Sequence, residues 1–393
     1  MMNSTRLKHV LASVLLASSL ASNQAAAAVG SFDWQLPNWV PAPVVPADNP
    51  MSQEKVELGR HLFYETRLSS NGSMSCATCH IQALGFSDGR PTTPGVNGDK
   101  AIRNPMALGN VAYLPVLTWM NPQLTSLEIQ TLIPLFGEHP VEMGMAGHEE
   151  ELWSRLKSDQ TYVNLFTAAF PTEATRGDEQ LYSLSTLTKA IAAFQRTLLS
   201  FNSPYDRYKY GTEPTAISNS AKRGETLFFG EKMECYHCHG GLNFTDNVVH
   251  ERMPFPELGF HNTGLYNEDG RGAYPSENPG IIELTAEPRD QGKFRTPSLR
   301  NVGVTGPYMH DGSISTLKDV IRSHYAVKGR GATSNGKPNP LRSELIIGFA
   351  IDEAELSDLI AFLHTLTDEE FLADKRFANP WITPSFEDAV WLK

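Results

Sequence analysis

Apolar side chains recur at three- and four-residue intervals in two stretches of the chain. The positions are Leu181, Leu184, Leu187, Ile191, Phe194 and Leu198 in the first stretch, and Leu356, Leu359, Ile360, Leu363 and Leu366 in the second. This spacing predicts two amphipathic helices. Segments 190–194 (AIAAF) and 358–362 (DLIAF) occupy matching places in the two stretches, so we expect each helix to close one of two similar units.

A second pair of similar segments lies upstream of these helices. Residues 57–63 read ELGRHLF and residues 222–228 read KRGETLF, so that Gly59 and Gly224 each stand three residues before a Leu-Phe pair. Both segments have the composition of a helix. Repeated local order indicates two copies of one structural unit, and hence a mostly α-helical fold with long loops.

The start of the chain predicts export. Residues 1–28 carry Arg6 and Lys8, then an apolar run over 10–20, then alanines ending at Ala28. This order is typical of a signal peptide cleaved near Ala28, because the apolar run is too short to cross a bilayer. Residues 29–50 are rich in Pro and also contain Trp34 and Trp39, which predicts an extended arm, since proline fixes φ and lacks an N–H donor.

The remaining composition excludes some partners. No later stretch reaches about 18 uninterrupted apolar residues, so no membrane insertion is expected. The net charge of the 393-residue chain is −11, and no Lys/Arg-rich tract is present. An acidic chain of this kind argues against nucleic acid and anionic membranes as partners.

All four cysteines of the chain lie in two copies of one motif, Cys76-Ala77-Thr78-Cys79-His80 and Cys235-Tyr236-His237-Cys238-His239. Two thiols separated by two residues and followed by His form the attachment signal of a c-type haem, with His as the proximal iron ligand. A zinc site or two disulfides would also use four cysteines, but neither explains the His in both copies. We therefore predict two covalently bound c-type haems, which in an exported chain suggests a bacterial periplasm.

The motifs divide the chain. We expect a first cytochrome c-like domain over residues 51–205 and a second over 206–393, with the boundary inside the Pro- and Gly-containing segment 201–220. Residues 92–144 form an insertion too long for a minimal haem module. Residues 254–291 are rich in Gly, Pro and Asn, and long irregular segments of this kind are uncommon unless they have a function.

Two further segments, 295–302 (RTPSLRNV) and 305–312 (TGPYMHDG), together with the doubled haem motif, resemble the bacterial di-haem cytochrome c peroxidase and MauG superfamily. The resemblance covers essentially all of the mature chain. It implies a di-haem peroxidase architecture and an enzyme that acts on H2O2.

The resemblance implies an open first haem. Related peroxidases that need reductive activation cap this iron with a His in the following loop, and no His occurs here between His80 and His139. Met106 is an alternative ligand. The distal Glu and Gln of the family correspond to Glu142 as acid-base and Gln130 as hydrogen-bond donor, which suits the cleavage of a peroxide O–O bond. Trp119 corresponds to a Trp that carries oxidising equivalents between the haems.

The second haem is expected to be six-coordinate, through His239 and one other side chain. Leu317, Ile321 and Tyr325 are spaced by four residues, which predicts that Tyr325 continues the buried face of one helix. The family pattern of Tyr before a Gly-rich loop also favours Tyr325, with His324 and Met309 as rivals. A calcium ion bound by Asn104 and the carbonyls of Thr305 and Pro307 is implied by the resemblance.

A narrower resemblance concerns the substrate. Residues 136–142 (FGEHPVE), 203–208 (SPYDRY) and 260–267 (FHNTGLYN) resemble the MbnH-type di-haem enzymes. That resemblance implies a bis-Fe(IV) state that oxidises a Trp of an MbnP-like periplasmic partner protein to kynurenine. The alternative is a peroxidase that reduces H2O2 to water with electrons from a small cytochrome or cupredoxin.

Overall fold

The fold comes from a computed structural model that describes residues 32–329 and 337–382. The predicted signal peptide, residues 1–28, lies outside the described residues. Residues from Leu36 onward form one unit, and the description below concerns that unit. Within the described residues, no helix is both long enough and apolar enough to cross a membrane.

The predicted mostly α-helical fold is confirmed. The α-helices are α1 (Gln53–Phe63), α2 (Cys76–Cys79), α3 (Leu127–Phe136), α4 (Glu149–Lys157), α5 (Gln160–Ala169), α6 (Pro171–Arg176), α7 (Asp178–Leu181), α8 (Leu184–Arg196), α9 (Pro204–Lys209), α10 (Asn219–Phe228), α11 (Tyr236–His239), α12 (Ile282–Thr285), α13 (Leu317–Ser323), α14 (Glu353–His364) and α15 (Glu369–Ala373). Short 3-10 helices are η1 (Thr66–Leu68), η2 (Gln82–Leu84), η3 (Val111–Tyr113), η4 (Pro288–Asp290) and η5 (Tyr325–Val327). Strands β1 (Phe260–Asn262) and β2 (Lys293–Arg295) pair antiparallel, with His261 opposite Phe294.

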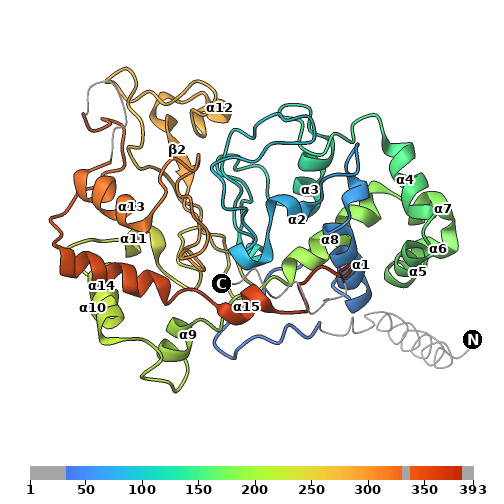
Figure 1. The fold of residues 1–393 in the computed structure, drawn as a ribbon, viewed down its shortest axis with the longest axis horizontal. Helices are drawn as coiled ribbons and strands as arrows, with labels where there is room; N and C mark the ends of the chain where they lie inside the picture. The colour runs from blue at the N-terminus through green and yellow to red at the C-terminus, as the bar shows by residue number, and fades with distance from the viewer. Residues whose placement is uncertain (1–31, 330–336, 383–393) are drawn as a thin grey trace, which may run out of the picture. The chain divides into compact units, whose positions relative to one another are not determined.

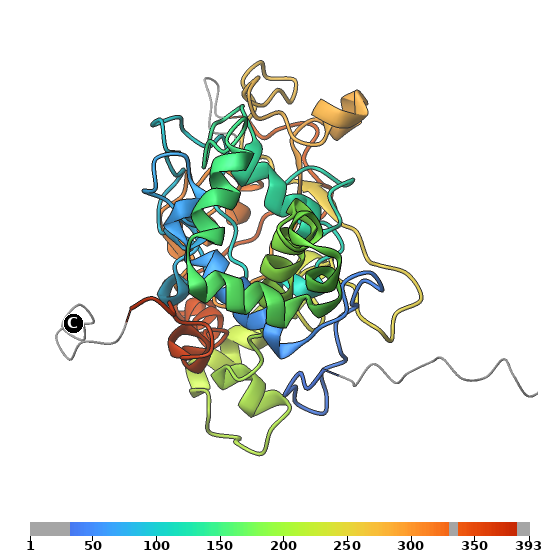
Figure 2. The ribbon, with the colours of Figure 1, turned by 90° about the vertical axis from the view of Figure 1, so that its right-hand side faces the viewer.

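The helices form two groups joined by irregular chain. Figure 1 shows α1 and α3 to α8 on one side and α10, α11, α13 and α14 on the other. Figure 2 brings the green helices of the first group to the front, on the side away from the second group. Segment 92–144 is irregular apart from η3 and α3, and segment 254–291 holds only β1, α12 and η4. Both segments supply side chains to the site described below.

One helix pair defines each group, and a glycine sets its closest approach. In the first group, a Cβ added to Gly59 of α1 would stand 1.9 Å from the carbonyl oxygen of Ala190 in α8. In the second group, a Cβ added to Gly224 of α10 would stand 1.9 Å from the carbonyl oxygen of Asp358 in α14. Only glycine allows backbones to come this close. The sequence repeat around these glycines therefore encodes one helix crossing, used twice.

The predicted helix over residues 181–198 is shorter than its apolar pattern. Leu181 ends α7, and Ser183 starts α8 because its hydroxyl accepts a hydrogen bond from the Thr186 N–H. Leu198 lies beyond the helix end but is fully buried. The apolar spacing therefore predicted correctly that these residues are buried, but the helix that it predicted is too long.

The repeat also extends to a pair of buried asparagines that the sequence analysis did not identify. Asn110 and Asn301 both have φ of 61°. The Asn110 N–H donates to the Leu198 carbonyl just after α8, and the Asn301 N–H donates to the Leu366 carbonyl just after α14. Their side-chain oxygens accept from the N–H groups of Ser200 and Asp368, respectively. The two asparagines tie the chain after each closing helix back to its own haem module.

Candidate functional site

The first Cys-x-x-Cys-His motif forms α2 and the residue after it. The Nδ1 atom of His80 lies 2.7 Å from the carbonyl oxygen of Phe86, a residue with φ of 63°. A carbonyl acceptor at Nδ1 fixes the tautomer in which Nε2 carries a lone pair for a metal. Phe63, Phe86 and Phe194 pack around the motif in one apolar cluster. His80 is therefore prepared as an iron ligand in an apolar setting.

The second motif repeats this arrangement. The Nδ1 atom of His239 lies 3.1 Å from the carbonyl oxygen of Phe244, which has φ of 50°. Phe228, Phe244 and Phe362 pack beside it with Cys235 at the edge of the cluster. The same backbone turn after each motif orients both imidazoles, which agrees with two equivalent haem attachment sites.

The rival uses of the cysteines do not fit the structure. All four cysteines are free, so no disulfide joins them. Over residues 32–329 and 337–382, the one group of potential metal ligands combines a single cysteine, Cys238, with Asp246 and His261. The two Cys-x-x-Cys pairs therefore do not converge on one zinc ion.

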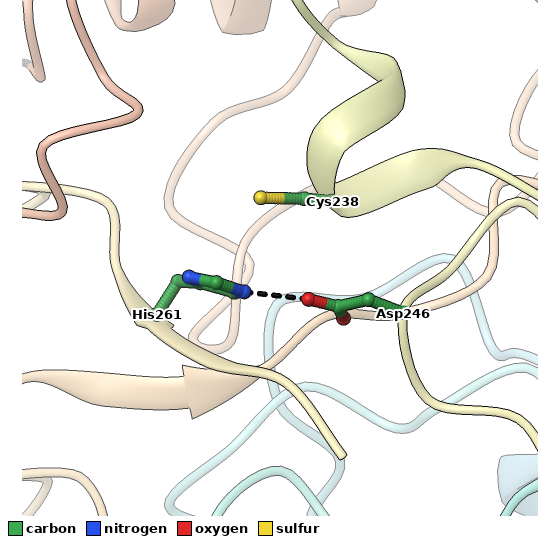
Figure 3. Close-up of side chains that lie close together, drawn as sticks. All are labelled: Cys238, Asp246 and His261. Carbon is green, nitrogen blue, oxygen red and sulfur yellow. Dashed lines mark hydrogen bonds and ion pairs between the residues drawn. The ribbon is translucent and has the colours of Figure 1, made fainter. Parts of the chain in front are cut away.

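Cys238, Asp246 and His261 lie together beside the second motif (Figure 3). The His261 Nε2 atom is 2.6 Å from an Asp246 carboxylate oxygen. Asp246, with a smaller contribution from Cys238, raises the pKa of His261 to about 10. Attachment of haem would convert Cys238 to a thioether and leave the His261–Asp246 ion pair next to that bond.

A large, mostly apolar cavity adjoins the second motif. It is lined by Cys235, Cys238 and His239, by apolar side chains that include Phe228, Leu359 and Leu363, and by Tyr325 and Met309. A porphyrin needs this combination of apolar walls, attachment thiols and an axial imidazole. The residues present thus fit a c-type haem.

The charge distribution in the cavity fits the same cofactor. Arg295 lines it and is only 2% exposed, and burial lowers the pKa of its guanidinium to about 10. Its side chain donates to the carbonyls of Thr118 and Thr296 and to the Met106 sulfur, and Asp246 acts on its charge without an ion-pair contact in the described part of the chain. A buried cation that no carboxylate contacts is costly. A haem propionate would supply an anion in contact with it.

Tyr325 lines this cavity. The prediction that Tyr325 belongs to the helix of Leu317 and Ile321 is wrong. Helix α13 ends at Ser323, and Tyr325 begins η5 after a turn at His324, whose φ of −124° and ψ of −72° are not helical. His324 is fully buried and does not line the cavity. Burial raises the pKa of Tyr325. Of the three ligand candidates, Tyr325 and Met309 therefore reach the same space as His239.

Trp119 is one of the residues that line this cavity. It is 8% exposed and donates from Nε1 to the Asn104 carbonyl oxygen at 2.8 Å. Its own carbonyl accepts the Arg295 N–H at 2.7 Å. These bonds fix the indole in one orientation at the edge of the second haem cavity.

The three predicted calcium ligands, Asn104, Thr305 and Pro307, are all among the residues that line this cavity, and calcium binding stays a prediction. The Asn104 amide nitrogen donates to the carbonyls of Arg90 and Pro91, which leaves its side-chain oxygen as a ligand. One amide oxygen and two carbonyls are hard-oxygen donors of the type calcium prefers.

The structure places Glu142 near the first haem motif. Burial raises the pKa of Cys79 to about 12, and the Glu142 carboxylate adds to this shift, as it does for Cys76. Burial also raises the pKa of Glu142 itself. Gln130 is the fourth residue of α3 and is half-buried. Its contacts do not tie it to the motif, so its role stays a prediction.

The sequence analysis did not predict that Arg295 or the His261–Asp246 pair belongs to the site. Arg295 lies inside the RTPSLRNV segment, but one sequence does not show that its charge is buried. A signal for Asp246 exists: Phe86-Ser87-Asp88 and Phe244-Thr245-Asp246 occupy matching places after the two motifs. Aligning the chain with itself would have identified it.

Comparisons with known proteins agree with this site. Residues 53–214 match the di-haem cytochrome c peroxidase family. The chain is 39% identical over 334 residues to the methylamine utilization protein MauG of Methylophilus methylotrophus, covering 84% of this chain and 86% of that protein. It is 36% identical over 377 residues to cytochrome-c peroxidase IdrP1 of Denitromonas iodatirespirans, covering 91% and 94%. The crystal structure of a MauG-like protein associated with microbial copper homeostasis matches with a TM-score of 0.84 at 46% identity, covering 89% of this chain and 100% of that chain.

Proposed function

Because the chain belongs to the di-haem cytochrome c peroxidase and MauG family of oxidoreductases, which act on H2O2, we propose that it oxidises a Trp of a separate periplasmic protein. The product would be kynurenine. The observation that carries this proposal is Tyr325 in the cavity of His239, where an anionic oxygen ligand would favour high oxidation states of iron. The similarity to a MauG-like protein of copper homeostasis supports it.

The chain's own residues would act as follows. Bound haem iron would supply the redox chemistry by reacting with peroxide and exchanging single electrons. Glu142 would take the proton of the inner peroxide oxygen and deliver it to the outer oxygen, which leaves as water. Gln130 would donate a hydrogen bond to the departing oxygen. Trp119 would pass electrons from the second haem side to the first.

The proposed reaction balances in atoms and electrons. Trp and two molecules of H2O2 give N-formylkynurenine and two molecules of water. Hydrolysis of the formyl group then gives kynurenine and formate. Each peroxide accepts two electrons and two protons, and each electron pair comes from the indole of the partner. A side chain in a folded partner cannot reach a buried iron, so the electrons have to cross the surface of this chain.

The direct test combines the holoprotein, H2O2 and the protein encoded next to it in its genome. A mass gain of two oxygen atoms on one Trp of that neighbour, or the change expected for kynurenine, would support the proposal. Peroxide consumption only in the presence of a reduced small cytochrome or cupredoxin would reject it. That second outcome would establish the peroxidase alternative, which the similarity to IdrP1 favours.

Tyr325→Phe should abolish the oxygen ligand of the second haem. We expect the spectrum of the low-spin ferric haem to change to that of a haem with a weaker or missing axial ligand, because phenylalanine offers no donor atom. Electron paramagnetic resonance of the oxidised protein measures this. Met309→Leu is the matched control and should leave the spectrum intact. An unchanged spectrum for Tyr325→Phe, with a changed one for Met309→Leu, would assign the ligand to Met309.

Arg295→Gln should lower the reduction potential of the second haem. Removing a buried positive charge near a haem favours the more positively charged ferric state. Spectroelectrochemical titration of the holoprotein measures the potential, and Arg295→Lys, which keeps the charge, should stay close to the wild type. Equal potentials for Gln and Lys variants would show that the charge of Arg295 does not act on the haem.

We also propose one calcium ion at Asn104, Thr305 and Pro307. Elemental analysis of the purified protein should find one calcium per chain, and Asn104→Ala should lose it, because the side-chain oxygen is removed. The carbonyl ligands cannot be removed by substitution. Retention of calcium by Asn104→Ala would place the ion elsewhere.

A further inference from the structure

The two haem modules carry a carboxylate at the same place but differ in what accompanies it. Asp88 and Asp246 each follow, by two residues, the phenylalanine whose carbonyl lies at the proximal histidine, Phe86 in the first module and Phe244 in the second. We propose that the buried charge of Asp88 lowers the reduction potential of the first haem, and that His261 cancels the equivalent charge of Asp246 at the second haem.

Asp88 is a buried carboxylate without an ion-pair contact in the part of the chain that the structure describes. It is 6% exposed. One carboxylate oxygen accepts from the backbone N–H of Arg90 at 2.9 Å, and the other accepts from the Thr93 hydroxyl. Hydrogen bonds from uncharged donors stabilise a carboxylate without cancelling its charge. The Arg90 side chain is exposed, so solvent and salt screen its own charge.

The charge of Asp88 acts on the groups that would hold the first haem. Burial raises the pKa of the Cys79 thiol to about 12, and Glu142 and Asp88 both add to that shift. Burial lowers the pKa of His80, and the Phe86 carbonyl and Asp88 oppose that shift. Asp88 therefore influences both the attachment cysteine and the proximal ligand. A negative charge near a haem iron favours the ferric over the ferrous state.

The second module has an imidazole where the first has a hydroxyl. His261, from β1, forms an ion pair with Asp246 at 2.6 Å, whereas Asp88 has the Thr93 hydroxyl as its side-chain partner (Figure 3). The two charges of the pair act in opposite directions on the proximal ligand. Burial lowers the pKa of His239, Asp246 opposes that shift, and His261 adds to it. The pair therefore leaves little net charge beside the second haem.

Unequal local charge suits two irons with different tasks. The first haem is predicted to react with peroxide, and its iron then has to give up electrons beyond the ferric state. A carboxylate nearby stabilises each increase in the positive charge of that iron. Asp88 would thus be a positioning residue that acts through its charge and not by contact with peroxide. This consequence rests on the function proposed above, whereas the effect on the reduction potential does not.

Asp88→Asn removes the charge with little change in shape, and Asp88→Ser is a second uncharged variant if the amide disturbs haem attachment. Spectroelectrochemical titration of the holoprotein, with electron paramagnetic resonance to assign each haem, should show a more positive midpoint potential for the first haem only. Thr93→Val keeps the charge and loses a hydrogen bond, and Asp178→Asn removes a charge from a side chain that is 76% exposed, so neither should raise the potential. An unchanged potential in the Asp88 variants, or an equal rise in Thr93→Val, would overturn the role of Asp88.

His261→Gln tests the cancellation at the second haem. Glutamine can still donate a hydrogen bond to Asp246 but carries no charge, so the midpoint potential of the second haem should become more negative. The double variant His261→Gln, Asp246→Asn lacks both charges and should return close to the wild-type potential. No shift in the single variant would show that His261 does not cancel Asp246. A negative shift that persists in the double variant would show that the charge of Asp246 is not its cause, and either result would overturn the cancellation.

Discussion

Glu142→Gln is expected to slow the reaction of the first haem with peroxide by roughly two to four orders of magnitude, the usual contribution of a positioned acid-base group. The amide keeps the shape of the carboxylate but cannot accept the peroxide proton. Stopped-flow absorbance of the holoprotein mixed with H2O2 measures the rate directly. The prediction rests on the position of Glu142 near Cys76 and Cys79, the two cysteines of the first haem motif.

The loop that carries Glu142 is held in place by its backbone. The Val96 N–H donates to the Glu142 carbonyl at 2.8 Å, and the Met143 N–H donates to the Pro134 carbonyl at 2.9 Å. A Cβ on Gly95 would stand 1.9 Å from the Val141 carbonyl oxygen, so the two segments touch through backbone alone. The carboxylate is thus positioned by atoms that the substitution leaves unchanged, and the variant should fold normally.

The pH profile provides a second readout for the same residue. Glu142 has to be ionised to accept a proton, so the rate should fall as the pH drops through its pKa. Because burial raises that pKa, the fall should begin at a higher pH than it would for an exposed Glu. The Gln variant should lose this limb of the profile altogether.

Glu138→Gln is the matched control, because Glu138 belongs to the same loop and is exposed. It should react with peroxide at the wild-type rate. If Glu142→Gln were as fast as Glu138→Gln, the acid-base group would have to be another side chain near the first haem.

The repeat was predictable from the sequence because the same residue types recur at matching places in the two copies. Gly59 and Gly224 each contact a backbone carbonyl of a closing helix, so neither position tolerates another residue. The sequences around the two glycines are similar. The haem motifs could also be recognised in the sequence, because the chemistry of haem attachment fixes both the residue types and their spacing. These features need no information about the rest of the fold.

The error at Tyr325 has a different origin. A four-residue spacing continues from Leu317 through Ile321 to Tyr325, but spacing does not show where a helix ends. The backbone turns at His324, so Tyr325 reaches the cavity from η5, whereas His324 is buried and does not line the cavity. The choice of Tyr325 over His324 as a cavity residue agrees with the structure, although the helical argument for it does not.

The remainder of the site depends on contacts between distant segments. Arg295 meets Thr118 and Met106, which are more than a hundred positions away in the sequence, and its lack of an ion-pair contact among the described residues appears only once the chain is folded. A surface pocket lined by Trp39 and Tyr210 joins the arm to the α9 region in the same way. Neither arrangement leaves a pattern of residue types or spacings in one sequence.

Gly59→Ala and Gly224→Ala should each destabilise the protein by roughly 3 kcal/mol or more, because the atom in the way is a backbone carbonyl that cannot rotate aside. Helix propensity alone predicts the opposite sign, a gain of about 1 kcal/mol for Ala over Gly inside a helix. The sign of the change therefore decides whether the close helix crossing exists. Differential scanning calorimetry of the holoprotein measures it, with a lower Tm expected for both variants.

Gly109→Ala tests whether a loss of stability is specific to the helix crossings or follows from any replacement of glycine by alanine. A Cβ on Gly109 would have its nearest neighbour at 3.4 Å, an ordinary contact, so this variant should melt close to the wild type. Since Gly59 and Gly224 face equivalent carbonyls at the same distance, their two variants should also lose similar amounts of stability. A large loss at one glycine with none at the other would mean that the two helix pairs do not share one geometry, and that the repeat in the sequence does not extend to the fold.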